Sequence, residues 1–555
     1  MCGIFALLVN SNESIVDENI LHSFFMKGQK RGPEFSTLKK EKINIASMEL
    51  YLGFHRLAIN GLDDASNQPL YYKDLSVICN GEIYNYKKIL EDPSIQIQTN
   101  SDCEVILQLY EKNKHLCVSM LDGVFSFVIY DKKNKKVMVA RDPYGVRPLY
   151  ETIYKNGNIG FASDISPLTF DSFEKIRPFP PGTYAIYEIN INYNSWNMTH
   201  HERYFFNTSY LPSYNLTPNP ILYYMEQFVK RFKEAIYKRV DNCEREIACL
   251  LSGGLDSSLI SAFVCKMYKK KTNKILQTYS IGLEGGEDLK YAKKVAKHIG
   301  SNHTEIIVTN EDFINSIPEV IRDIESYDTT TVRASVGNWN IGKYISKNSE
   351  AKVIFNGDGA DELAGGYLYF HKCPDNKEFD NETLRLLEDI HRYDVLRSDK
   401  SISSHGLEPR TPFLDKELTR FYLNIPIEIR NHNNLLGNNK CEKNFIRKSI
   451  ELYEPDLIPK EILWRRKEAF SDGVSSHKKS WYEIIQEHLE SEDKRTTKKY
   501  HHNPPKTKEQ LYYREIFDFI FPTPCDRLIP YFWMPKYVEG VNDASARTLG
   551  IYNKS

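Results

Sequence analysis

Cysteine occupies position 2 of the chain, directly after the initiator methionine. If Met1 is removed, Cys2 carries both a thiol and a free α-amine. The α-amine has a pKa of about 7.7–8 and the thiol one of about 8.5, so the amine can serve as the base for its own side chain. Considered alone, Cys2 is more simply explained as a buried thiol without function, so its interpretation depends on the residues that follow.

Four polar segments follow Cys2 in a characteristic order. They are Arg31-Gly32-Pro33-Glu34, Arg56-Leu57, Asn80-Gly81-Glu82-Ile83-Tyr84-Asn85 and Ser101-Asp102-Cys103-Glu104. In this order they resemble the class II, or N-terminal-nucleophile, glutamine amidotransferases, which carry R-G-P-D, a substrate-holding Arg, N-G-x-I-x-N and S-D-x-E. A turn or a solvated charge would explain any single segment, whereas the ordered set is specific.

The resemblance implies that glutamine is hydrolysed at Cys2. Amide hydrolysis builds an oxyanion, to which the Asn80 side chain and the Gly81 N–H can donate. An arginine such as Arg56 suits the α-carboxylate of glutamine, and acidic groups at Asp102 and Glu82 suit its α-ammonium. The implied glutamine-binding residues are Arg56, Leu57, Ala58, Ile59, Asn60, Asn80, Gly81, Glu82 and Asp102.

Two positions depart from the pattern of these amidotransferases. Lys30 stands where histidine usually precedes R-G-P, and Glu34 replaces the aspartate. Both are neighbours of implied active-site residues in the sequence. We expect the effect of each on activity to be modest.

A glycine-rich loop is the first candidate binding site in the second half of the chain. Ser252-Gly253-Gly254-Leu255-Asp256-Ser257-Ser258 follows an expected strand and begins an expected helix. Glycines let the backbone approach a ligand, and the N–H groups at a helix start face anions. An aspartate there can hold the Mg²⁺ that accompanies a polyphosphate. The S-G-G-x-D-S pattern resembles the pyrophosphate loop of ATP pyrophosphatases; the alternative is an ordinary glycine-rich turn.

An acidic segment follows another expected strand. It is Asn356-Gly357-Asp358-Gly359-Ala360-Asp361-Glu362, and its carboxylates repel one another unless a cation lies among them. The segment resembles S-G-E-G-S-D-E of asparagine synthetases, with aspartate at 358 in place of glutamate. Segments 327–335, 408–415 and 465–473 match further motifs of that family. The chain therefore resembles the glutamine-hydrolysing asparagine synthetases over nearly its whole length.

This resemblance implies a reaction and assigns residues to it. Aspartate would be activated by ATP as β-aspartyl-AMP with release of pyrophosphate, and ammonia from glutamine would then form asparagine. The implied residues are Leu251, Ser252, Gly253, Gly254, Asp256, Ser257, Ser258, Ile281, Asn356 and Gly357 for ATP; Asp256 and Asp361 for Mg²⁺; Thr330, Arg333 and Arg410 for the aspartate or pyrophosphate end; and Cys2, Asn80, Gly81, Asp358 and Lys467 for catalysis. An apolar ammonia tunnel is expected near Met120 and Val124. No redox cofactor and no zinc are expected.

The elements that must position these residues fall into two groups. Short apolar runs separated by turns, such as Ile4–Val9, Leu75–Cys79, Phe125–Tyr130, Val137–Ala140 and Thr183–Ile189, predict antiparallel sheets before residue 205. Apolar runs at 247–251, 278–283, 304–308 and 353–355 alternate with helical patterns and predict a parallel sheet. We therefore expect an N-terminal α+β sandwich of the N-terminal-nucleophile type at 2–205, a linker at 206–219, an ATP-pyrophosphatase-like α/β domain at 220–525 and a C-terminal tail at 526–555.

Composition limits the setting in which this chemistry occurs. The chain has 555 residues, and 73 basic against 74 acidic residues give a net charge of −1, which argues against nucleic-acid binding through bulk positive charge. No apolar run reaches 18 residues, so we expect no membrane span. The N-terminus lacks the features of a secretory signal, and none of the ten cysteines forms a C-x-x-C pair. We expect a cytoplasmic enzyme that acts on small molecules and can form a homodimer.

Several alternatives compete with this interpretation. Gly337–Lys343 imitates a Walker A loop but has Tyr344 where Ser or Thr is needed, and Gly357-Asp358-Gly359 lacks the third glycine of a dinucleotide fingerprint. A hexosamine-forming aminotransferase would share the first half only. A β-lactam-forming relative would lack the N-terminal cysteine. A non-catalytic relative of the same fold would not be expected to keep Cys2, Asn80, Asp256 and Lys467.

Overall fold

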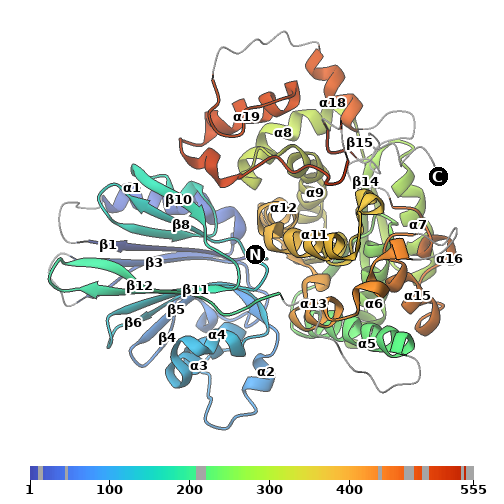
Figure 1. The fold of residues 1–555 in the computed structure, drawn as a ribbon. Coiled ribbons are helices and arrows are strands. Elements are labelled where there is room, and N and C mark those ends of the chain that lie inside the picture. The colour runs from blue at the N-terminus through green and yellow to red at the C-terminus, as the bar shows by residue number, and fades with distance from the viewer. Residues whose placement is uncertain are drawn as a thin grey trace.

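The computed structural model describes residues 1–10, 17–43, 48–207, 220–434, 441–467, 481–490, 499–538, 540 and 543–545. Two bodies lie side by side, one built mainly of strands and the other mainly of helices around a smaller sheet (Figure 1). The expected two-domain architecture is thereby confirmed. The predicted linker 206–219 lies almost entirely outside the described residues, as do residues 468–473 of the last motif and much of the expected tail, so the predicted domain boundaries stay predictions.

The N-terminal domain is a sandwich of two six-stranded antiparallel sheets. The strand order is β10-β8-β9-β1-β3-β2 in one sheet and β12-β11-β7-β6-β5-β4 in the other. The elements are β1 (Gly3–Val9), α1 (Glu18–Phe25), β2 (Phe35–Glu41), β3 (Glu49–Arg56), β4 (Leu70–Tyr72), β5 (Leu75–Ile83), α2 (Tyr86–Ile89), α3 (Val105–Asn113), α4 (Cys117–Met120), β6 (Gly123–Asp131), β7 (Lys136–Arg141), β8 (Tyr150–Tyr154), β9 (Ile159–Ala162), β10 (Phe173–Pro178), β11 (Thr183–Asn190) and β12 (Ser195–Arg203).

Strand β1 shows why the sequence forms a sandwich. All seven of its residues are buried, because alternate side chains of a strand point to opposite faces and both faces of β1 are covered. Ile4, Ala6 and Leu8 pack in the core between the two sheets. Phe5 and Leu7 face the other way, in a cluster that includes Phe25 of α1. Helix α3 covers the second sheet in the same manner, which completes an αββα arrangement.

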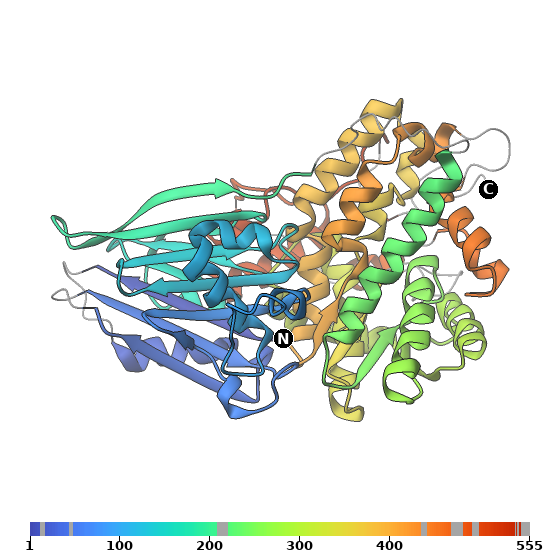
Figure 2. The same cartoon turned by 90° about the horizontal axis from the view of Figure 1, so that it is seen from below.

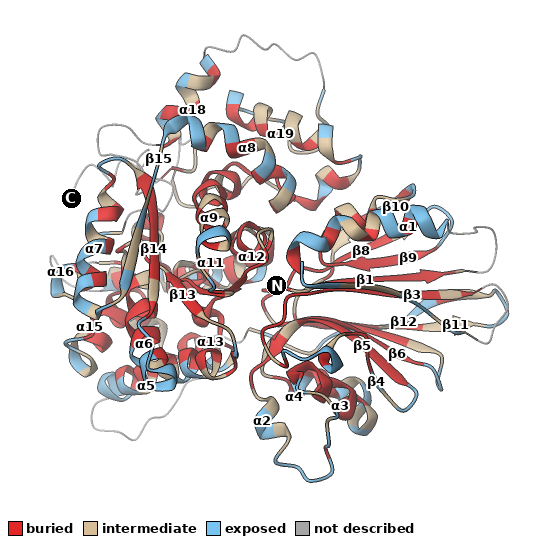
Figure 3. Cartoon of the chain, turned by 180° about the vertical axis from the view of Figure 1, so that it is seen from behind, coloured by how far each residue is buried: buried red, intermediate tan, exposed pale blue. Residues whose placement is uncertain are grey.

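The C-terminal domain is built on a five-stranded parallel sheet with the order β15-β14-β13-β16-β17. Its elements are α5 (Pro220–Asp241), β13 (Ile247–Leu250), α6 (Leu255–Thr272), β14 (Gln277–Leu283), α7 (Glu287–Ile299), β15 (Asn302–Val308), α8 (Asn310–Ile324), α9 (Thr329–Asn348), β16 (Val353–Phe355), α10 (Ala360–Ala364), α11 (Asn376–Asp389), α12 (Asp394–Ser403), β17 (Glu408–Arg410), α13 (Lys416–Leu423), α14 (Ile427–Arg430), α15 (Asn444–Tyr453), α16 (Lys460–Leu463), α18 (Trp481–Glu490) and α19 (Lys508–Ile520). Helices lie on both sides of this sheet, with α6 and α7 on one side and α9 and α12 on the other (Figure 3). Figure 2 shows the same largely helical body from below.

Strand β17 was not predicted from the sequence. It has three residues, one of which is Pro409, and such a segment has no period from which a strand can be recognised. It pairs in parallel with β16, where Phe355 lies opposite Arg410. Proline is tolerated there because β17 is at the edge of the sheet. The Walker-like segment 337–343 lies within α9, so its rejection is confirmed.

The interface between the two domains is buried (Figure 3). The N-terminus of the chain lies there rather than on the outside (Figure 1). Among the helices that the structure describes, none is both long enough and apolar enough to span a bilayer. Eight of the ten cysteines are buried, and Cys2 and Cys441 are partly exposed.

Candidate active sites

Cys2 lies immediately before β1, at the junction of the two domains. The Cys2 Sγ is 3.5 Å from the carbonyl oxygen of Leu57, and Arg31 Nε donates to the Cys2 carbonyl at 3.0 Å. Burial raises the pKa of the Cys2 thiol to about 11. The thiol therefore needs a base close by before it can act as a nucleophile.

Met1 is buried between Cys2 and the C-terminal domain. Its amine donates to the carbonyl of Leu407 at 3.1 Å, and burial lowers the pKa of that amine to about 5. With Met1 in place, the terminal amine contacts the region before β17 and belongs to a different residue from the thiol. Removal of Met1 would put the amine on Cys2 itself.

Asn80 and Gly81 are adjacent on β5. The Asn80 side chain is fully buried; its Nδ2 makes only a long hydrogen bond of 3.4 Å to Ser163 Oγ, so it could turn to a better acceptor. Residue 81 must be glycine, since a Cβ there would lie 2.4 Å from the carbonyl oxygen of Val124. A loosely held buried amide is the kind of donor that an oxyanion hole requires.

Arg56 ends β3 and holds the loop that follows it. Its guanidinium donates to the carbonyls of Gly61 and Asp63 and, at 2.7 Å, to Asn67 Oδ1. Residues 57–60 lie between these anchor points. Asn60 Nδ2 in turn donates to Glu82 Oε2 at 2.6 Å, which ties this loop to the end of β5.

Glu82 and Asp102 are two buried carboxylates at this site. Burial raises the pKa of Glu82 well above its usual value and that of Asp102 to about 6. The Ile83 N–H donates to Asp102 at 2.7 Å, and Asn242 of the other domain donates to both carboxylates, at 3.2 and 3.4 Å. Two acids buried together favour a cationic ligand such as an α-ammonium.

The two departures from the amidotransferase pattern have structural partners. Lys30 points to the other domain, where Nζ is 2.7 Å from Asp323 Oδ1 near the end of α8. Glu34 accepts from the Ala58 N–H at 2.7 Å and forms an ion pair with Arg245. Lys30 therefore serves the domain interface, whereas Glu34 supports the 57–60 loop.

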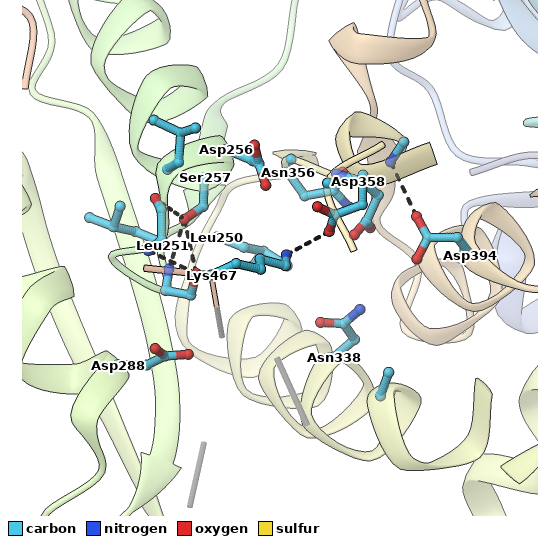
Figure 4. A pocket seen from close by; sticks show the side chains of 18 of the residues that line it. Leu250, Leu251, Asp256, Ser257, Asp288, Asn338, Asn356, Asp358, Asp394 and Lys467 are labelled. Carbon is cyan, nitrogen blue, oxygen red and sulfur yellow. Dashed lines mark hydrogen bonds and ion pairs between the residues drawn. The ribbon is translucent and has the colours of Figure 1, made fainter. Parts of the chain in front are cut away.

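A second site is a cavity of about 230 Å³ at the carboxyl ends of β13 and β16. Figure 4 shows side chains from several elements facing it. Ligands bind at such strand ends in parallel sheets. Predicted ATP residues that line the cavity are Leu251, Ser252, Gly254, Asp256, Ser257, Ile281, Asn356 and Gly357; Gly253 and Ser258 do not line it.

The glycine-rich loop has a defined local structure. Ser257 Oγ accepts from the Ser252 N–H at 3.2 Å and lies 3.0 Å from Ser252 Oγ, which closes the loop. Gly253 has φ +74°, and a Cβ there would meet the backbone nitrogen of Ala292 at 2.4 Å. Glycine is thus required at 253 by conformation and by space. Helix α6 begins at Leu255, within this segment, and its first residues Leu255, Asp256 and Ser257 line the cavity, so the start of a helix lies where an anion would be favoured.

Acidic and basic side chains alternate across the cavity. Lys443 Nζ lies 2.5 Å from Asp256 Oδ2 and 2.6 Å from Asp361 Oδ1. Lys467 Nζ lies 2.5 Å from Asp361 Oδ2. The two lysines hold the pKa of Asp361 well below its usual range, although burial opposes this. Two carboxylates and two ammonium groups thus face one space, an arrangement that suits a metal–polyphosphate ligand.

Asp358 lies beside this group and has a cation of its own. Its Oδ1 is 3.3 Å from Arg397 Nη2 of α12, and Arg397 also pairs with Asp394. The other oxygen, Oδ2, is buried and has no hydrogen-bond partner among the residues that the structure describes. Burial raises the pKa of Asp358 to about 6, against the opposing charge of Arg397. An unpartnered buried carboxylate oxygen at a cavity wall is available to a ligand.

The residues predicted at the aspartate or pyrophosphate end are not brought together. Thr330 lines the cavity. Arg333 is buried away from it, paired with Glu509 at 2.5 Å and Asp543 at 2.7 Å. Arg410 lies at the domain interface, 3.2 Å from Glu82 of the first site. The tunnel expectation is wrong for Met120, which is 47% exposed, whereas Val124 is buried at the junction of the domains.

Two family models cover most of the chain. The model described as a glutamine amidotransferase domain matches residues 1–195, and the one described as asparagine synthase matches residues 227–380 and 373–539. The curated asparagine synthetases (glutamine-hydrolyzing) of Gallus gallus and Homo sapiens are each 40% identical to the chain, with 100% of both sequences covered. The chain belongs to the glutamine-hydrolysing asparagine synthetase family.

Membership of this asparagine synthetase family excludes the hexosamine-forming aminotransferase, which would share only the first half of the chain, because the second half matches asparagine synthase. Among solved structures, the glutamine phosphoribosylpyrophosphate amidotransferase from B. subtilis covers 50% of this chain and 65% of its own, with 19% identity and a TM-score of 0.30. That overlap is too low to add to the argument.

Two residues of this asparagine synthetase family member were missed in the sequence. Lys443 bridges Asp256 and Asp361 in the cavity, and Asn242 bridges Glu82 and Asp102 in the first site. Neither belongs to a recognisable motif. Lys443 precedes α15 and Asn242 follows α5, so the only available signal was a polar residue at a helix end, which is too common to be diagnostic.

Proposed function

We propose that the chain makes asparagine from aspartate, with ATP as the activating substrate and glutamine as the nitrogen donor. The observation that carries the proposal is full-length identity of 40% to glutamine-hydrolysing asparagine synthetases, combined with chemically complete residue sets in both halves. Cys2 and Asn80 serve one half, and the Ser252–Ser257 loop with Asp256 and Lys467 serves the other.

In the first half, the thiol of Cys2 attacks the side-chain amide of glutamine after Met1 has been removed. The Cys2 α-amine accepts the thiol proton, and the Asn80 side chain and the Gly81 N–H stabilise the oxyanion. Collapse releases ammonia and leaves a thioester, which water hydrolyses to glutamate. The Arg56 region holds the α-carboxylate, and Glu82 with Asp102 holds the α-ammonium. The buried carboxylate pair supports this assignment.

In the second half, a β-carboxylate oxygen of aspartate attacks the α-phosphorus of ATP. The bond to the β-phosphate oxygen breaks, so pyrophosphate leaves and β-aspartyl-AMP remains. Ammonia then attacks the acyl carbon and AMP departs. Activation is required because a bare carboxylate is a poor electrophile. Lys467 and Lys443 stabilise the phosphate charge in the transition state, and Asp358 with Arg397 orients the reacting groups.

Asp256 and Asp361 would hold Mg²⁺ together with the phosphates. Within the described ranges, Asp256 Oδ1 is buried without a hydrogen-bond partner, which supports this role. In the described part of the chain no cluster of three or more metal-ligating side chains is present, and Mg²⁺ commonly uses only one or two carboxylates when phosphates supply the other oxygens. When bound, Mg²⁺ neutralises phosphate charge. Lys443 lies between the two carboxylates and would move towards the phosphates.

Ammonia must reach the second site without meeting water, where it would be protonated. The buried interface that contains Cys2, Leu57 and Val124 supports an internal route. For the cellular setting we propose the cytoplasm, since the ten cysteines are unpaired thiols and disulfides are rare in reducing compartments. The expected absence of a nucleic-acid partner and the homodimeric state stay predictions.

The direct test is product analysis with purified enzyme. Incubation with aspartate, glutamine, ATP and Mg²⁺ should give asparagine, with AMP and pyrophosphate in equal amounts by ³¹P NMR. Stoichiometric ADP would mean acyl-phosphate chemistry and would contradict the assignment of the Ser252–Ser257 loop. Glutamate without asparagine would leave only the first half of the proposal standing.

A further inference from the structure

The glutamine site is not built from the N-terminal domain alone. Residues 242–245, the segment between α5 and β13 of the C-terminal domain, contact the loop 57–61 that follows Arg56. The Glu244 N–H donates to the Ile59 carbonyl at 3.1 Å, and Arg245 Nε donates to the Ala58 carbonyl at 2.8 Å. In the other direction, the Gly61 N–H donates to Glu244 Oε1 at 3.4 Å. The 242–245 segment therefore holds the loop at Ala58, Ile59 and Gly61.

The same segment reaches the two buried carboxylates. Asn242 is 3% exposed, and its Nδ2 lies between Glu82 Oε2 at 3.2 Å and Asp102 Oδ2 at 3.4 Å. A single neutral amide thus separates two acids that would otherwise repel each other. A hydrogen bond from a neutral donor to a carboxylate stabilises the ionised form without cancelling its charge. The pair can therefore still attract a cationic ligand.

Arg410 of β17 supplies the cation at this place. Its Nη2 is 3.2 Å from Glu82 Oε2, and neither side chain is more than 6% exposed. Its Nη1 donates to the Asn242 carbonyl at 2.7 Å, so the same guanidinium fixes the position of the 242–245 segment. Through its backbone, the Arg410 carbonyl accepts from the N–H of Asn356, which lines the ATP cavity.

We propose that Asn242 and Arg410 are positioning residues of the glutamine site, through which the synthetase domain holds the Glu82 and Asp102 carboxylates in place for the α-ammonium of glutamine. This inference rests on the proposed glutaminase activity and deepens it. It moves Arg410 from the aspartate or pyrophosphate end to the nitrogen-donor site. It also explains why Arg410 is buried at the interface rather than in the cavity.

The charge balance around Glu82 sets the pH dependence that the proposal requires. The charged groups that face Glu82 are Asp102, Glu408, Arg147 and Arg410. Arg410 and Arg147 favour the ionised form of Glu82, and the other two acids oppose it. A further negative charge at position 242 would therefore raise the pKa of both carboxylates. As the pH falls, the carboxylates of the variant would become protonated at a higher pH than those of the parent, and ammonium binding would be lost there.

Asn242→Asp is the decisive variant, because aspartate has nearly the same shape as asparagine. In the full-length enzyme we expect the KM for glutamine to rise about ten- to hundredfold, the range for losing a hydrogen bond to a charged group. The acid limb of kcat/KM for glutamine should shift to higher pH. We expect kcat for glutamine hydrolysis to change by less than about threefold, and ammonia-dependent synthesis to match the parent. A purely structural role would instead lower Tm without a selective change in KM.

Arg410→Met and Arg410→Lys separate the two assignments of Arg410. The proposal predicts a larger rise in the KM for glutamine than in that for aspartate with Arg410→Met, and partial rescue with Arg410→Lys. Tyr144→Phe is the matched control, since Tyr144 makes a buried hydrogen bond to Thr419 of the other domain and touches neither carboxylate. Its KM for glutamine should stay within about twofold of the parent.

The outcomes distinguish this inference from the proposed function. A parent enzyme that fails to hydrolyse glutamine would overturn both. A parent that hydrolyses glutamine, with an unchanged KM for glutamine in Asn242→Asp, would overturn the inference alone. A rise in the KM for aspartate that exceeds the rise for glutamine in Arg410→Met would return Arg410 to the synthetase site. Should the Arg410 variants fail to fold, Asn242→Asp alone decides.

Discussion

The two sites of this enzyme handle buried negative charge in opposite ways. At the proposed glutamine site, Glu82 and Asp102 are held by backbone and amide donors and by one arginine from the other domain. In the synthetase cavity, Asp256 and Asp361 are bridged directly by lysines. The first arrangement buries two acids whose ionised forms a small organic cation can favour. In the second arrangement, two carboxylates are paired with two lysines. The metal ion of a metal–nucleotide ligand can take the place of the lysines at the carboxylates, and the phosphates can take the place of the carboxylates at the lysines.

The difference follows from the substrates. An α-ammonium carries one positive charge and is recognised by fixed carboxylates, so rigidity favours binding. ATP brings phosphates and a divalent cation of opposite sign, so both acids and bases are needed within one space. The glutamine site is also closed by the second domain, whereas the cavity is formed by one domain. Separate chemistry in two connected domains is the main consequence, and variants in each should leave the other active.

The largest expected effect is that of Cys2→Ala. Loss of the nucleophile should lower glutamine hydrolysis by about 10⁴- to 10⁶-fold, as for other covalent catalysts. Ammonia-dependent asparagine synthesis should stay near the parent rate, since the cavity does not contain Cys2. Glutamate release and asparagine formation from ammonium chloride are measured in parallel. Equal loss of glutamine hydrolysis and of ammonia-dependent synthesis would contradict the presence of two separate sites.

Asp256→Ala should produce the reverse pattern. Removal of the carboxylate that faces Lys443 in the first turn of α6 should lower pyrophosphate release at least about a hundredfold. Glutamine hydrolysis should persist. Asp256→Asn keeps the shape and removes only the charge, so it should be nearly as defective if charge is what matters. Recovery of most of the activity in Asp256→Asn would instead point to a packing role.

Variants at position 358 test the role of a single carboxylate in the cavity. Asp358 is one methylene shorter than the glutamate that stands in this segment of other asparagine synthetases. A catalytic group misplaced by about 1 Å can cost on the order of a hundredfold in rate. Arg397 at 3.3 Å holds the shorter side chain, which favours a site that has adjusted to it. Asp358→Ala should stop pyrophosphate release, while Asp358→Glu should stay within about tenfold of the parent. Parental pyrophosphate release by Asp358→Ala would remove this carboxylate from the mechanism.

The smallest effect is expected for Lys30→Met. Lys30 is 59% exposed and pairs with Asp323 across the interface, and exposed ion pairs contribute about 0–1 kcal/mol. The KM for glutamine should change by less than about twofold. Steady-state kinetics with glutamine checks this. A tenfold change would mean that the side chain at position 30 acts on the substrate.

Sequence patterns predicted the parts of the molecule that are local. Strands such as β1 and β6 and the glycine-rich segment at the start of α6 can be recognised from apolar runs, turns and glycine spacing. The predicted fold class is confirmed. Strand β17 was missed because three residues with a proline have no period. Asn242, Lys443 and the interface position of Arg410 could not be predicted either, since their roles depend on contacts between segments more than a hundred residues apart.

Isotope tracing of nitrogen tests whether the amide nitrogen of glutamine becomes the side-chain nitrogen of asparagine. The full-length enzyme is incubated with [amide-¹⁵N]glutamine, aspartate, ATP and Mg²⁺, with unlabelled ammonium added at the concentration of glutamate formed. The ¹⁵N enrichment of the side-chain amide of asparagine should exceed that of the free ammonium pool, and one glutamate, one AMP and one pyrophosphate should form for each asparagine. Cys2→Ala should give only unlabelled asparagine. Unlabelled asparagine from the parent enzyme, or ADP in place of AMP, would contradict the account.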